Sequence, residues 1–444
     1  MKKEVKNRKS KRRLSIQKIF NLVSLTFILA CCIFYGSRFI KLYLENNKEN
    51  EVKSFADNLI EENENLLHIN ENYYFSGNTN KNYIKYSNLI WRIIRINKDE
   101  TITAILDNSI TSLALGTEKK YEESNINNWL NNQDKEYTGI LENYLNNIEN
   151  YLTTTNTCND KINDTKNITC QNTTKDLYIT IPSMYDYVNT GGSDSFMNNE
   201  ENYYTINQND NNKTWYINNE GKVGTSDGTD IIGVKPVITF KNSITKIDGN
   251  GSKETPYIIE KETSLFGSYV KLGNDIWRIY QVNDDNIKLS LNSYLTINNE
   301  EVKYKYSNNG YYHNDTKTGT LAYYLKNTYL PTLEYKDIIN EVKYSNGTYN
   351  NTNDYDYINV LKTTIDTKVT VLSIGDIILN PINTNYFTST GLSDNSNQIY
   401  VMQNNFKTYT KLSTSNLKIV PVISINKNLL TIGKGTIEEP FEVQ

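Results

Sequence analysis

The chain has 444 residues and a net charge of −4, and 37 % of its residues are hydrophobic. This length corresponds to about two to four domains, and the 35 Tyr add large, half-apolar rings for a core. Only 7 Pro and 2 His are present, which excludes collagen and proline-rich linkers and argues against a zinc site built on three His.

Charge is concentrated at the N-terminus. Residues 2–18 hold nine basic residues and one acidic residue, which gives a net charge of +8 and leaves −12 for the rest of the chain. A nucleic-acid-binding protein needs a basic face on its folded domain. We therefore expect no nucleic-acid partner and interpret 1–18 as a basic cytoplasmic tail.

An apolar run follows the basic tail. Ile19 to Gly36 contains 18 residues without a charge, close to the roughly 20 that a transmembrane helix needs. Extended by the amphipathic residues up to 43, it predicts an uncleaved membrane anchor over 19–43, with the N-terminus cytoplasmic and the bulk of the chain outside. Three alternatives remain: a cleaved signal peptide near Gly36, a lipidated Cys31, and a buried core helix.

The segment after the anchor is acidic and has apolar residues at helical spacing, including Phe55 and Leu59. We expect a helical stalk over 44–69. Such a stalk either forms a short coiled coil that dimerises the protein or lies against the first domain. We favour the second arrangement, because two heptads are too few for a coiled coil.

An internal repeat organises the rest of the chain. Three segments recur in the same order at spacings of 186, 185 and 184 residues: Tyr83–Ile93 as Tyr269–Ile279, the Pro-containing Val234–Ile238 as Ile419–Ile423, and Gly249–Tyr257 as Gly433–Phe441. Two copies of this length indicate duplicated domains and not a solenoid. We place extracytoplasmic repeat domains at 70–260 and 261–444.

Each copy has the same expected order of elements. The first opens with a hairpin of strands Tyr83–Asn97 and Thr101–Leu106, then a helical middle over 126–151. A late strand around Pro236, a Gly-rich turn and a short final strand follow; Pro within a strand suggests an edge position or a bulge. Matching segments of the second copy are a helical middle over 321–344 and a late strand over 417–425. The predicted class is α+β, mainly β.

The Gly-rich turn also imitates the first half of a calcium loop. Asp248–Ser252 has the acid and glycine spacing of such a loop, but Lys253 and Ile259 stand where an EF-hand needs Gly and Glu. The second copy keeps the glycines and loses the acids. We interpret the segment as a turn.

At these residues a family resemblance emerges. The Trp-Arg-Ile strand, Gly233–Ile238 and Asp248–Tyr257 resemble segments of uncharacterised, repeat-containing, membrane-anchored surface proteins of low-GC Gram-positive bacteria and related lineages. That resemblance implies an extracytoplasmic location and supplies no catalytic residue. Lys235 departs from the family, which commonly has Arg there. A weaker resemblance, at the level of fold only, links the Gly-Val-Lys-Pro-Val ending to C-type-lectin-like domains.

Few residues suggest chemistry. Cys158 and Cys170 close a 13-residue segment in a compartment that permits disulfides, so we treat them as a disulfide candidate against the alternative of two free thiols. Trp215 and Tyr216 follow a polar loop and are candidate ligand contacts, against the alternative of inward-packed strand residues. No catalytic residue, metal site or cofactor motif is expected.

These observations favour a single-pass, membrane-anchored surface protein with two non-catalytic extracytoplasmic domains that bind a polysaccharide, a cell-wall component or a surface protein. One alternative is an enzyme acting on the cell wall through scattered groups, which predicts converging carboxylates of perturbed pKa. Another is a structural component of a surface assembly that oligomerises through the stalk.

Overall fold

The computed structural model describes residues 20–21, 23–24, 26–41, 53–116, 120–131, 141–142, 145–166, 168–261, 264–308, 317–349, 363–376, 385–392, 397–403 and 408–443. The chain divides into two compact units, Met1–Ser54 and Phe55–Gln444. The expected basic tail, 1–18, lies outside the described residues, as do 42–43 of the expected anchor and 44–52 of the expected stalk.

The first unit contains a helix whose described residues include 26–41. Its apolar side chains are exposed, among them Phe27, Ile33 and Phe34. Over the parts of the chain that the structure describes, no helix combines the length and the apolar character needed to cross a membrane.

The stalk expected over 44–69 is wrong as one continuous helix. Helix α2 spans only Phe55–Glu62, and strand β1 already begins at Leu67. Phe55, Ala56 and Leu59 are buried in the core of the second unit, and the ring of Phe55 meets that of Tyr257 edge-on with 5.3 Å between centroids. The helix therefore lies against the first copy, as the favoured alternative stated, and its apolar face is already covered.

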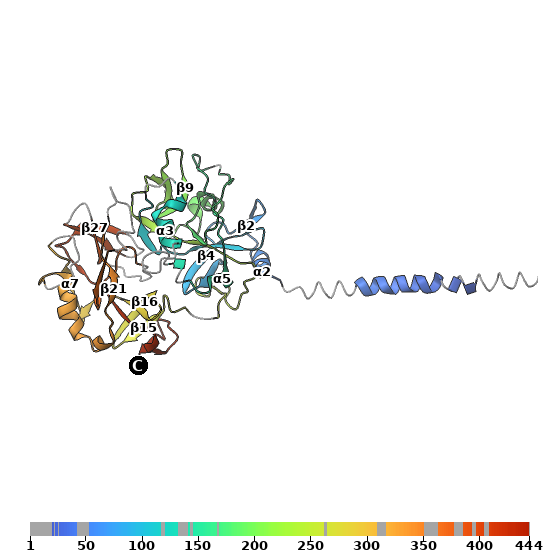
Figure 1. Cartoon of the computed structure of the whole chain (residues 1–444). Helices are drawn as coiled ribbons and strands as arrows, with labels where there is room; N and C mark the ends of the chain where they lie inside the picture. The colour runs from blue at the N-terminus through green and yellow to red at the C-terminus, as the bar shows by residue number, and fades with distance from the viewer. Residues whose placement is uncertain are drawn as a thin grey trace, which may run out of the picture. The chain divides into compact units, whose positions relative to one another are not determined.

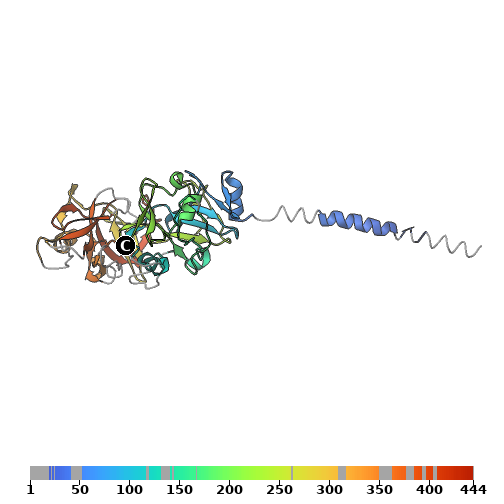
Figure 2. The same ribbon diagram turned by 90° about the horizontal axis from the view of Figure 1, so that it is seen from above.

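Strands dominate the second unit, which confirms the predicted α+β, mainly β class. Figures 1 and 2 show the first copy in blue to green and the second in yellow to red. The main sheet of the first copy has the order β1-β2-β4-β5-β13-β7, with β3 pairing β4, β14 pairing β3 and β8 pairing β13. Its strands are β1 (Leu67–Ile69), β2 (Asn72–Tyr74), β3 (Tyr83–Tyr86), β4 (Leu89–Ile96), β5 (Ile102–Leu106), β7 (Leu152–Thr153), β8 (Ile179–Thr180), β13 (Val237–Phe240) and β14 (Tyr257–Ile258).

A second sheet completes the first copy. Its order is β11-β10-β9-β12-β6. The strands are β6 (Thr111–Leu113), β9 (Tyr203–Gln208), β10 (Thr214–Ile217), β11 (Val223–Ser226) and β12 (Ile232–Val234).

The second copy repeats both sheets. Its main sheet runs β24-β29-β17-β16-β15-β31-β30, and its second sheet runs β20-β28-β25-β26-β27, with β22 (Thr348–Tyr349) beside β25. The main-sheet strands are β15 (Tyr269–Leu272), β16 (Asp275–Val282), β17 (Asn286–Leu291), β24 (Val369–Val371), β29 (Pro421–Asn426), β30 (Leu430–Ile432) and β31 (Phe441–Val443). The second-sheet strands are β20 (Lys303–Lys305), β25 (Tyr386–Leu392), β26 (Gln398–Met402), β27 (Thr408–Leu412) and β28 (Asn416–Lys418). Two further pairs stand apart, β18 (Thr296–Ile297) with β19 (Glu300–Glu301), and β21 (Val342–Ser345) with β23 (Thr364–Thr367).

Strand registers match as well as strand order. Trp91 of β4 lies opposite Ile84, and Trp277 of β16 lies opposite Val270. Each ladder to the next strand is interrupted once, between Ile93 and Arg95 in the first copy and between Ile279 and Gln281 in the second. A bulge shifts side chains relative to the partner strand, so its recurrence at one register position shows the same local geometry in both copies.

Two predicted strands differ in detail from those observed. The strand expected over Tyr83–Asn97 is two strands, because Ser87 and Asn88 adopt left-handed conformations, with φ of 53° and 57°, and form a tight turn. Pro236 lies neither at an edge nor in a bulge. It separates β12 from β13, where the chain passes from the second sheet into the main sheet. Proline donates no N–H to a ladder, which suits a residue between two sheets.

The helical middles are shorter than predicted. In the first copy α3 covers Asn125–Asn131 and α5 covers Ile148–Tyr151. In the second, α7 (Leu321–Tyr324) continues as a π-helical turn over Leu325–Tyr329, and a 3-10 turn follows at Leu330–Thr332. Pro331 lies in that last turn and cannot donate the N–H of a continuing helix.

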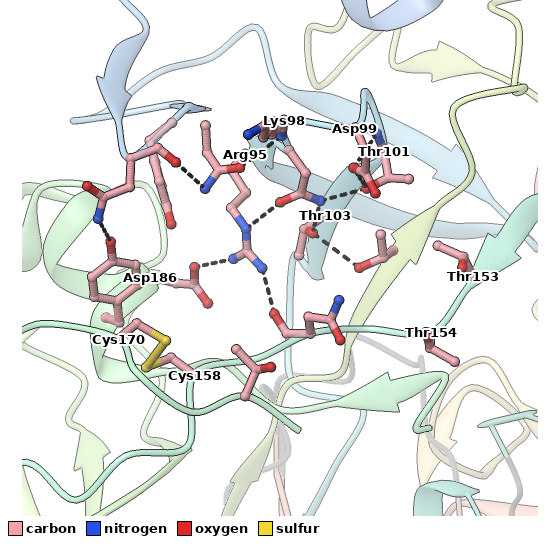
Figure 3. A pocket seen from close by; sticks show the side chains of 18 residues that line it. Arg95, Lys98, Asp99, Thr101, Thr103, Thr153, Thr154, Cys158, Cys170 and Asp186 are labelled. Atoms are coloured by element: carbon pink, nitrogen blue, oxygen red, sulfur yellow. Dashed lines mark hydrogen bonds and ion pairs between the residues drawn. A yellow bond between two sulfur atoms is a disulfide. The ribbon is translucent and has the colours of Figure 1, made fainter. Parts of the chain in front are cut away.

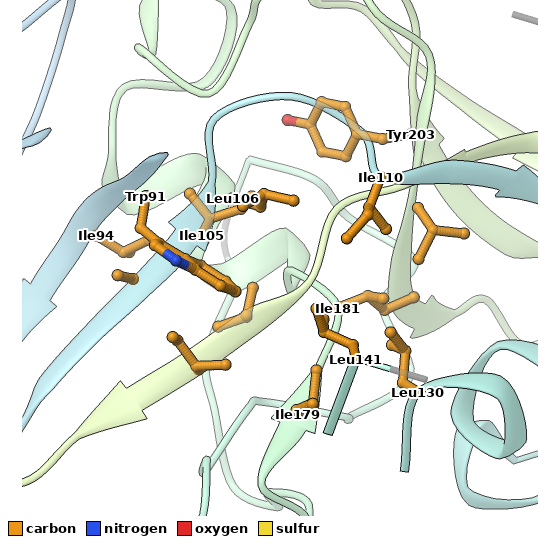
Figure 4. Packing of buried hydrophobic residues seen from close by; sticks show 14 of the residues in the cluster. Trp91, Ile94, Ile105, Leu106, Ile110, Leu130, Leu141, Ile179, Ile181 and Tyr203 are labelled. Atoms are coloured by element: carbon orange, nitrogen blue, oxygen red, sulfur yellow. The ribbon is translucent and has the colours of Figure 1, made fainter. Parts of the chain in front are cut away.

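Each copy has its own main hydrophobic core, and Tyr349, Ile374 and Tyr400 of the second copy pack into the core of the first. Figure 4 shows Trp91 packed among aliphatic side chains of the first copy, and both Trp91 and Trp277 are fully buried, as expected. Across the copies, Trp129 Nε1 donates to the carbonyl of Gly375 at 3.1 Å, and Thr111 Oγ1 donates to that of Ile374 at 2.6 Å. The boundary expected after residue 260 thus lies between β14 and β15, inside a single compact unit.

Glycines close each copy. Gly251 and Gly435 have φ of 80° and 70°, and a Cβ on either would lie about 2.5 Å from the ring of Tyr257 or Phe441. Each of those rings begins the final strand of its copy, and that strand runs parallel to β3 in the first copy and to β15 in the second. The turn interpretation therefore explains why these glycines recur without the acids.

We predict that Gly251→Ala lowers the free energy of unfolding more than Gly77→Ala does. Both positions have left-handed φ, but nothing lies within 4 Å of a Cβ at Gly77. Backbone strain alone costs about 1 kcal/mol, and forcing a methyl group against the Tyr257 ring adds about 1–3 kcal/mol. Urea unfolding of the full chain measures both values, and equal losses would contradict the packing role of Gly251.

Candidate functional site

The candidate site is a polar pocket of roughly 750 Å³ in the first copy. Figure 3 shows Arg95 at its centre, with the disulfide on one side and Thr153 and Thr154 on the other. Amide and hydroxyl side chains predominate among its lining residues, which are Asn70, Asn72, Tyr74, Arg95, Asn97, Lys98, Asp99, Thr101, Thr103, Thr153, Thr154, Asn156, Cys158, Cys170, Thr173, Tyr185, Asp186 and Thr239.

A buried ion pair forms the floor of the pocket. Arg95 follows the bulge in β4, and its Nη1 pairs with Oδ1 of Asp186. Asp186 belongs to helix α6 (Met184–Asn189), whose N-cap Ser183 also donates its hydroxyl to Asp186 Oδ2 at 2.7 Å. Burial is the largest single effect and would lower the pKa of Arg95, but the Asp186 carboxylate together with Tyr74 and Tyr185 outweighs it and raises the pKa. The guanidinium therefore stays charged and fixed in place.

Neutral groups accept hydrogen bonds from two further donors of Arg95. Its Nε donates to Asn97 Oδ1 at 2.8 Å, and its Nη2 donates to the carbonyl of Asn156 at 2.9 Å. Asn97 in turn donates to the hydroxyls of Thr101 and Thr103. This chain of hydrogen bonds ties the end of β4 to β5 and to the segment that contains the disulfide.

A disulfide joins Cys158 and Cys170, whose Cα atoms are 5.7 Å apart. Asp160 organises the enclosed loop by accepting hydrogen bonds from the backbone N–H groups of Gln171 and Asn172 and from the Asn172 amide. Burial would raise the pKa of Asp160, but these hydrogen bonds outweigh it and lower the pKa. Oxygen and sulfur atoms of Cys158, Asp160 and Cys170 lie within 4.8 Å of one another, but sulfurs in a disulfide are not thiolate ligands, so a metal would need the reduced form.

Three parts of the pocket belong to the first copy only. Arg95 corresponds to Gln281 at the same bulge position, and the second copy has no Cys. Strand β2 pairs with the end of β4 through Tyr74 and Arg95. In the described part of the second copy, β16 pairs only with β15 and β17. The first copy therefore adds Arg95, the two Cys and strand β2 to the sheets that both copies have, and all of these additions lie at the pocket.

Residues singled out from the sequence lie elsewhere. Trp215 and Tyr216 are in β10 and do not line this pocket. Trp215 packs against the core and donates its Nε1 to the carbonyl of Ile162 at 2.8 Å, which agrees with the inward-packed alternative. His68 stacks on Tyr73 in the hairpin of β1 and β2.

A signal for the pocket was present in the sequence but missed. Thr180-Ile181-Pro182-Ser183-Met184-Tyr185-Asp186 recurs as Thr370-Val371-Leu372-Ser373-Ile374-Gly375-Asp376. Both Asp residues interact with the Ser three positions earlier, because Ser373 N donates to Asp376 Oδ2 at 2.6 Å. The spacing of 190 differs from that of the other repeats, which hid the match. Nothing local links this motif to Arg95.

A second buried charged cluster lies in the first copy. Lys235 is 1 % exposed, and its Nζ lies 4.9 Å from the centre of the Tyr203 ring. Burial lowers the pKa of Lys235 to about 8, and the negative charges of Glu201 and Asp107 offset part of that effect. Glu201 accepts hydrogen bonds from Ser109, and Asp107 lies 3.6 Å from Arg92.

The second copy lacks most of this cluster, because Val420 replaces Lys235 and Asn292 replaces Asp107 at matching strand positions. We interpret the cluster as a structural part of the first copy, since Arg92, Asp107, Glu201 and Lys235 are all buried.

Comparison with known proteins identifies no relative: no family model, no curated protein and no solved structure matches this chain.

We predict that Cys158→Ser combined with Cys170→Ser lowers the free energy of unfolding by about 3 kcal/mol, the entropy expected for closing a loop of this size. Urea unfolding without reductant measures the loss. Cys31→Ser combined with Cys32→Ser is the matched control, because both of those thiols are free. Equal stability of the two double variants would contradict a structural role for the disulfide.

We predict that the folded state gains stability between pH 8 and about pH 9.5 because of Lys235. Its folded pKa of about 8 lies below the value of about 10.4 for an unfolded chain, so over this range the unfolded state binds more protons. The free energy of unfolding should therefore rise by about 1–2 kcal/mol.

Lys235→Met should remove this rise, whereas Lys213→Met, at an exposed position, should keep it. Urea unfolding across the pH range measures all three proteins. If the free energy of unfolding of Lys235→Met still rises over this pH range, a group other than Lys235 causes the rise.

Proposed function

We propose that this chain is a surface protein anchored by residues 19–43 in the lipid bilayer, with its N-terminus in the cytoplasm and 55–444 outside the cell. The basic flank and the apolar run support this topology, as do the exposed apolar side chains of the helix that includes 26–41. The disulfide also suits an oxidising, extracytoplasmic compartment.

The second unit, in this proposal, arose from one ancestral module that was copied once. The order of the strands that both copies contain, their matching register at Trp91 and Trp277, and the recurring bulge support a common origin. Membership of the anchored surface proteins rests on the sequence resemblance alone. The C-type-lectin-like relation rests only on the ending of β12 and the start of β13 and is proposed at the level of fold.

We propose that the folded unit binds a ligand through the pocket of the first copy and does no chemistry on it. The observation that carries this proposal is the convergence of the added hairpin β1–β2, Arg95 and the disulfide loop around one pocket. The described part of the second copy forms corresponding sheets without the hairpin, the Arg or the disulfide, so the sheets themselves do not require them. Ligand pockets of about 300–1,000 Å³ are typical.

Charge pairing in the pocket favours binding over catalysis. Asp186 is tied to Arg95 and Ser183, and Lys98 pairs with Glu71 at 2.8 Å. A general acid or base must exchange a proton with its substrate. Both carboxylate oxygens of Asp186 are already bound, one by Arg95 and the other by Ser183. The assembly alternative is disfavoured, because the apolar face of α2 is buried in its own unit.

The topology is tested by protease treatment of intact Gram-positive cells that express the full chain. We expect fragments of 55–444 to be released while an epitope on the basic tail stays protected. Protection of both parts would contradict an external location.

Binding is tested with the purified full chain in detergent and isolated cell-wall polymers and surface proteins. We expect retention on at least one of these materials, and Thr154→Trp should abolish it by filling the pocket. Thr225→Trp, on the exposed edge strand β11, is the matched control and should bind normally. Equal binding by both variants would exclude this pocket.

A further inference from the structure

We infer that the pocket of the first copy accepts a neutral carbohydrate, an inference that rests on the proposed binding function. Three properties of the pocket carry it: its charges are already paired, its unpaired groups are hydroxyls and an amide, and it offers a tyrosine ring. Each selects against one of the other common ligand classes.

Charged side chains of the pocket are engaged within the protein. Arg95 pairs with Asp186, and Lys98 pairs with Glu71. Asp99 accepts hydrogen bonds from the backbone N–H and the hydroxyl of Thr101, at 3.2 and 2.7 Å. A phosphate or carboxylate ligand is recognised by Arg or Lys donors that can turn toward it. Here an anion would have to break existing pairs, and a cation would meet the same obstacle.

Neutral polar groups remain available. The side chains of Thr153, Thr154, Asn156 and Thr173 line the pocket and have no hydrogen-bond partner among the residues described. Each hydroxyl can donate one hydrogen bond and accept two, and the amide can do both. These groups are exposed or half-buried and hydrogen-bond to water in the free protein. Sugar hydroxyls also donate and accept, so a sugar that displaces this water can replace its hydrogen bonds. A purely apolar ligand would leave them unpaired.

An aromatic ring supplies the apolar part. Tyr185 is half-buried at the pocket, and its hydroxyl accepts a hydrogen bond from Asn70 Nδ2 at 3.0 Å. Its ring packs edge-on against Tyr74, with 6.4 Å between centroids. A tyrosine held in this way presents apolar surface beside polar groups. A pyranose has a C–H face that can pack on such a ring and hydroxyls that can bond to the polar groups.

The experiment uses the full chain in detergent on an array of neutral glycans and of anionic polymers, including dextran, β-glucan, hyaluronate and polyphosphate. We expect binding to at least one neutral glycan that is equally strong at low and high salt, because no ion pair forms with the ligand. Thr154→Lys and Thr154→Glu should both weaken it by about tenfold or more, roughly the 1.4 kcal/mol of one lost hydrogen bond. Asn156→Ala, at an exposed position, gives a milder test of the same contact.

Thr225→Lys and Thr225→Glu are matched controls outside the pocket and should bind normally. Salt-sensitive binding of the unaltered chain to a polyanion, strengthened in Thr154→Lys and weakened in Thr154→Glu, would overturn the neutral ligand class and leave the proposed function in place. Glycan binding that survives every Thr154 and Asn156 variant would overturn the pocket as the glycan site. Failure to bind any glycan, with retention on a surface protein, would overturn the inference alone, whereas failure on every material would overturn the proposed function as well.

Discussion

The structure depends most on one strand pairing that both copies share, in which the last strand of the copy (β14 or β31) pairs with the strand that opens the repeated segment (β3 or β15). In the first copy Tyr257 of β14 lies beside Ile84 of β3, and in the second Phe441 of β31 lies beside Val270 of β15, both in parallel. The beginning and the end of a copy therefore meet at one place. A module closed in this way can be followed directly by a second copy without rearranging either main sheet.

Within this frame the two copies use their buried positions differently. The first places Arg95, Asp186, Lys235 and Glu201 in its interior, and burial of such charges is costly unless each is paired. At two of these positions the second copy has the neutral residues Gln281 and Val420. The frame thus does not require the charges, and those around Arg95 fix the hairpin and the disulfide loop that shape the pocket.

Features that depend on local sequence were predicted well. The buried Trp91 and Trp277 and the glycine turns follow from patterns within a few residues. The prediction that Pro236 lies at a strand edge or in a bulge was wrong. The sequence alone does not show that the chain passes from one sheet to the other at that residue. The turn at Ser87 and Asn88 was missed because it interrupts an otherwise continuous apolar strand pattern.

The candidate site was the least predictable part. Arg95 and Asp186 are 91 residues apart and meet only through the fold. Trp215 was a candidate because it is an aromatic beside a polar loop, but in the structure it packs against the core.

Oxidative cross-linking of paired cysteines tests directly whether each copy closes on itself. Lys85→Cys with Ile258→Cys, and Lys271→Cys with Glu442→Cys, should each form an intramolecular disulfide detectable by peptide mass spectrometry, because both pairs lie opposite each other. Exchanged pairs that cross-link equally well, or a second copy that forms no cross-link, would contradict two copies that each close on themselves.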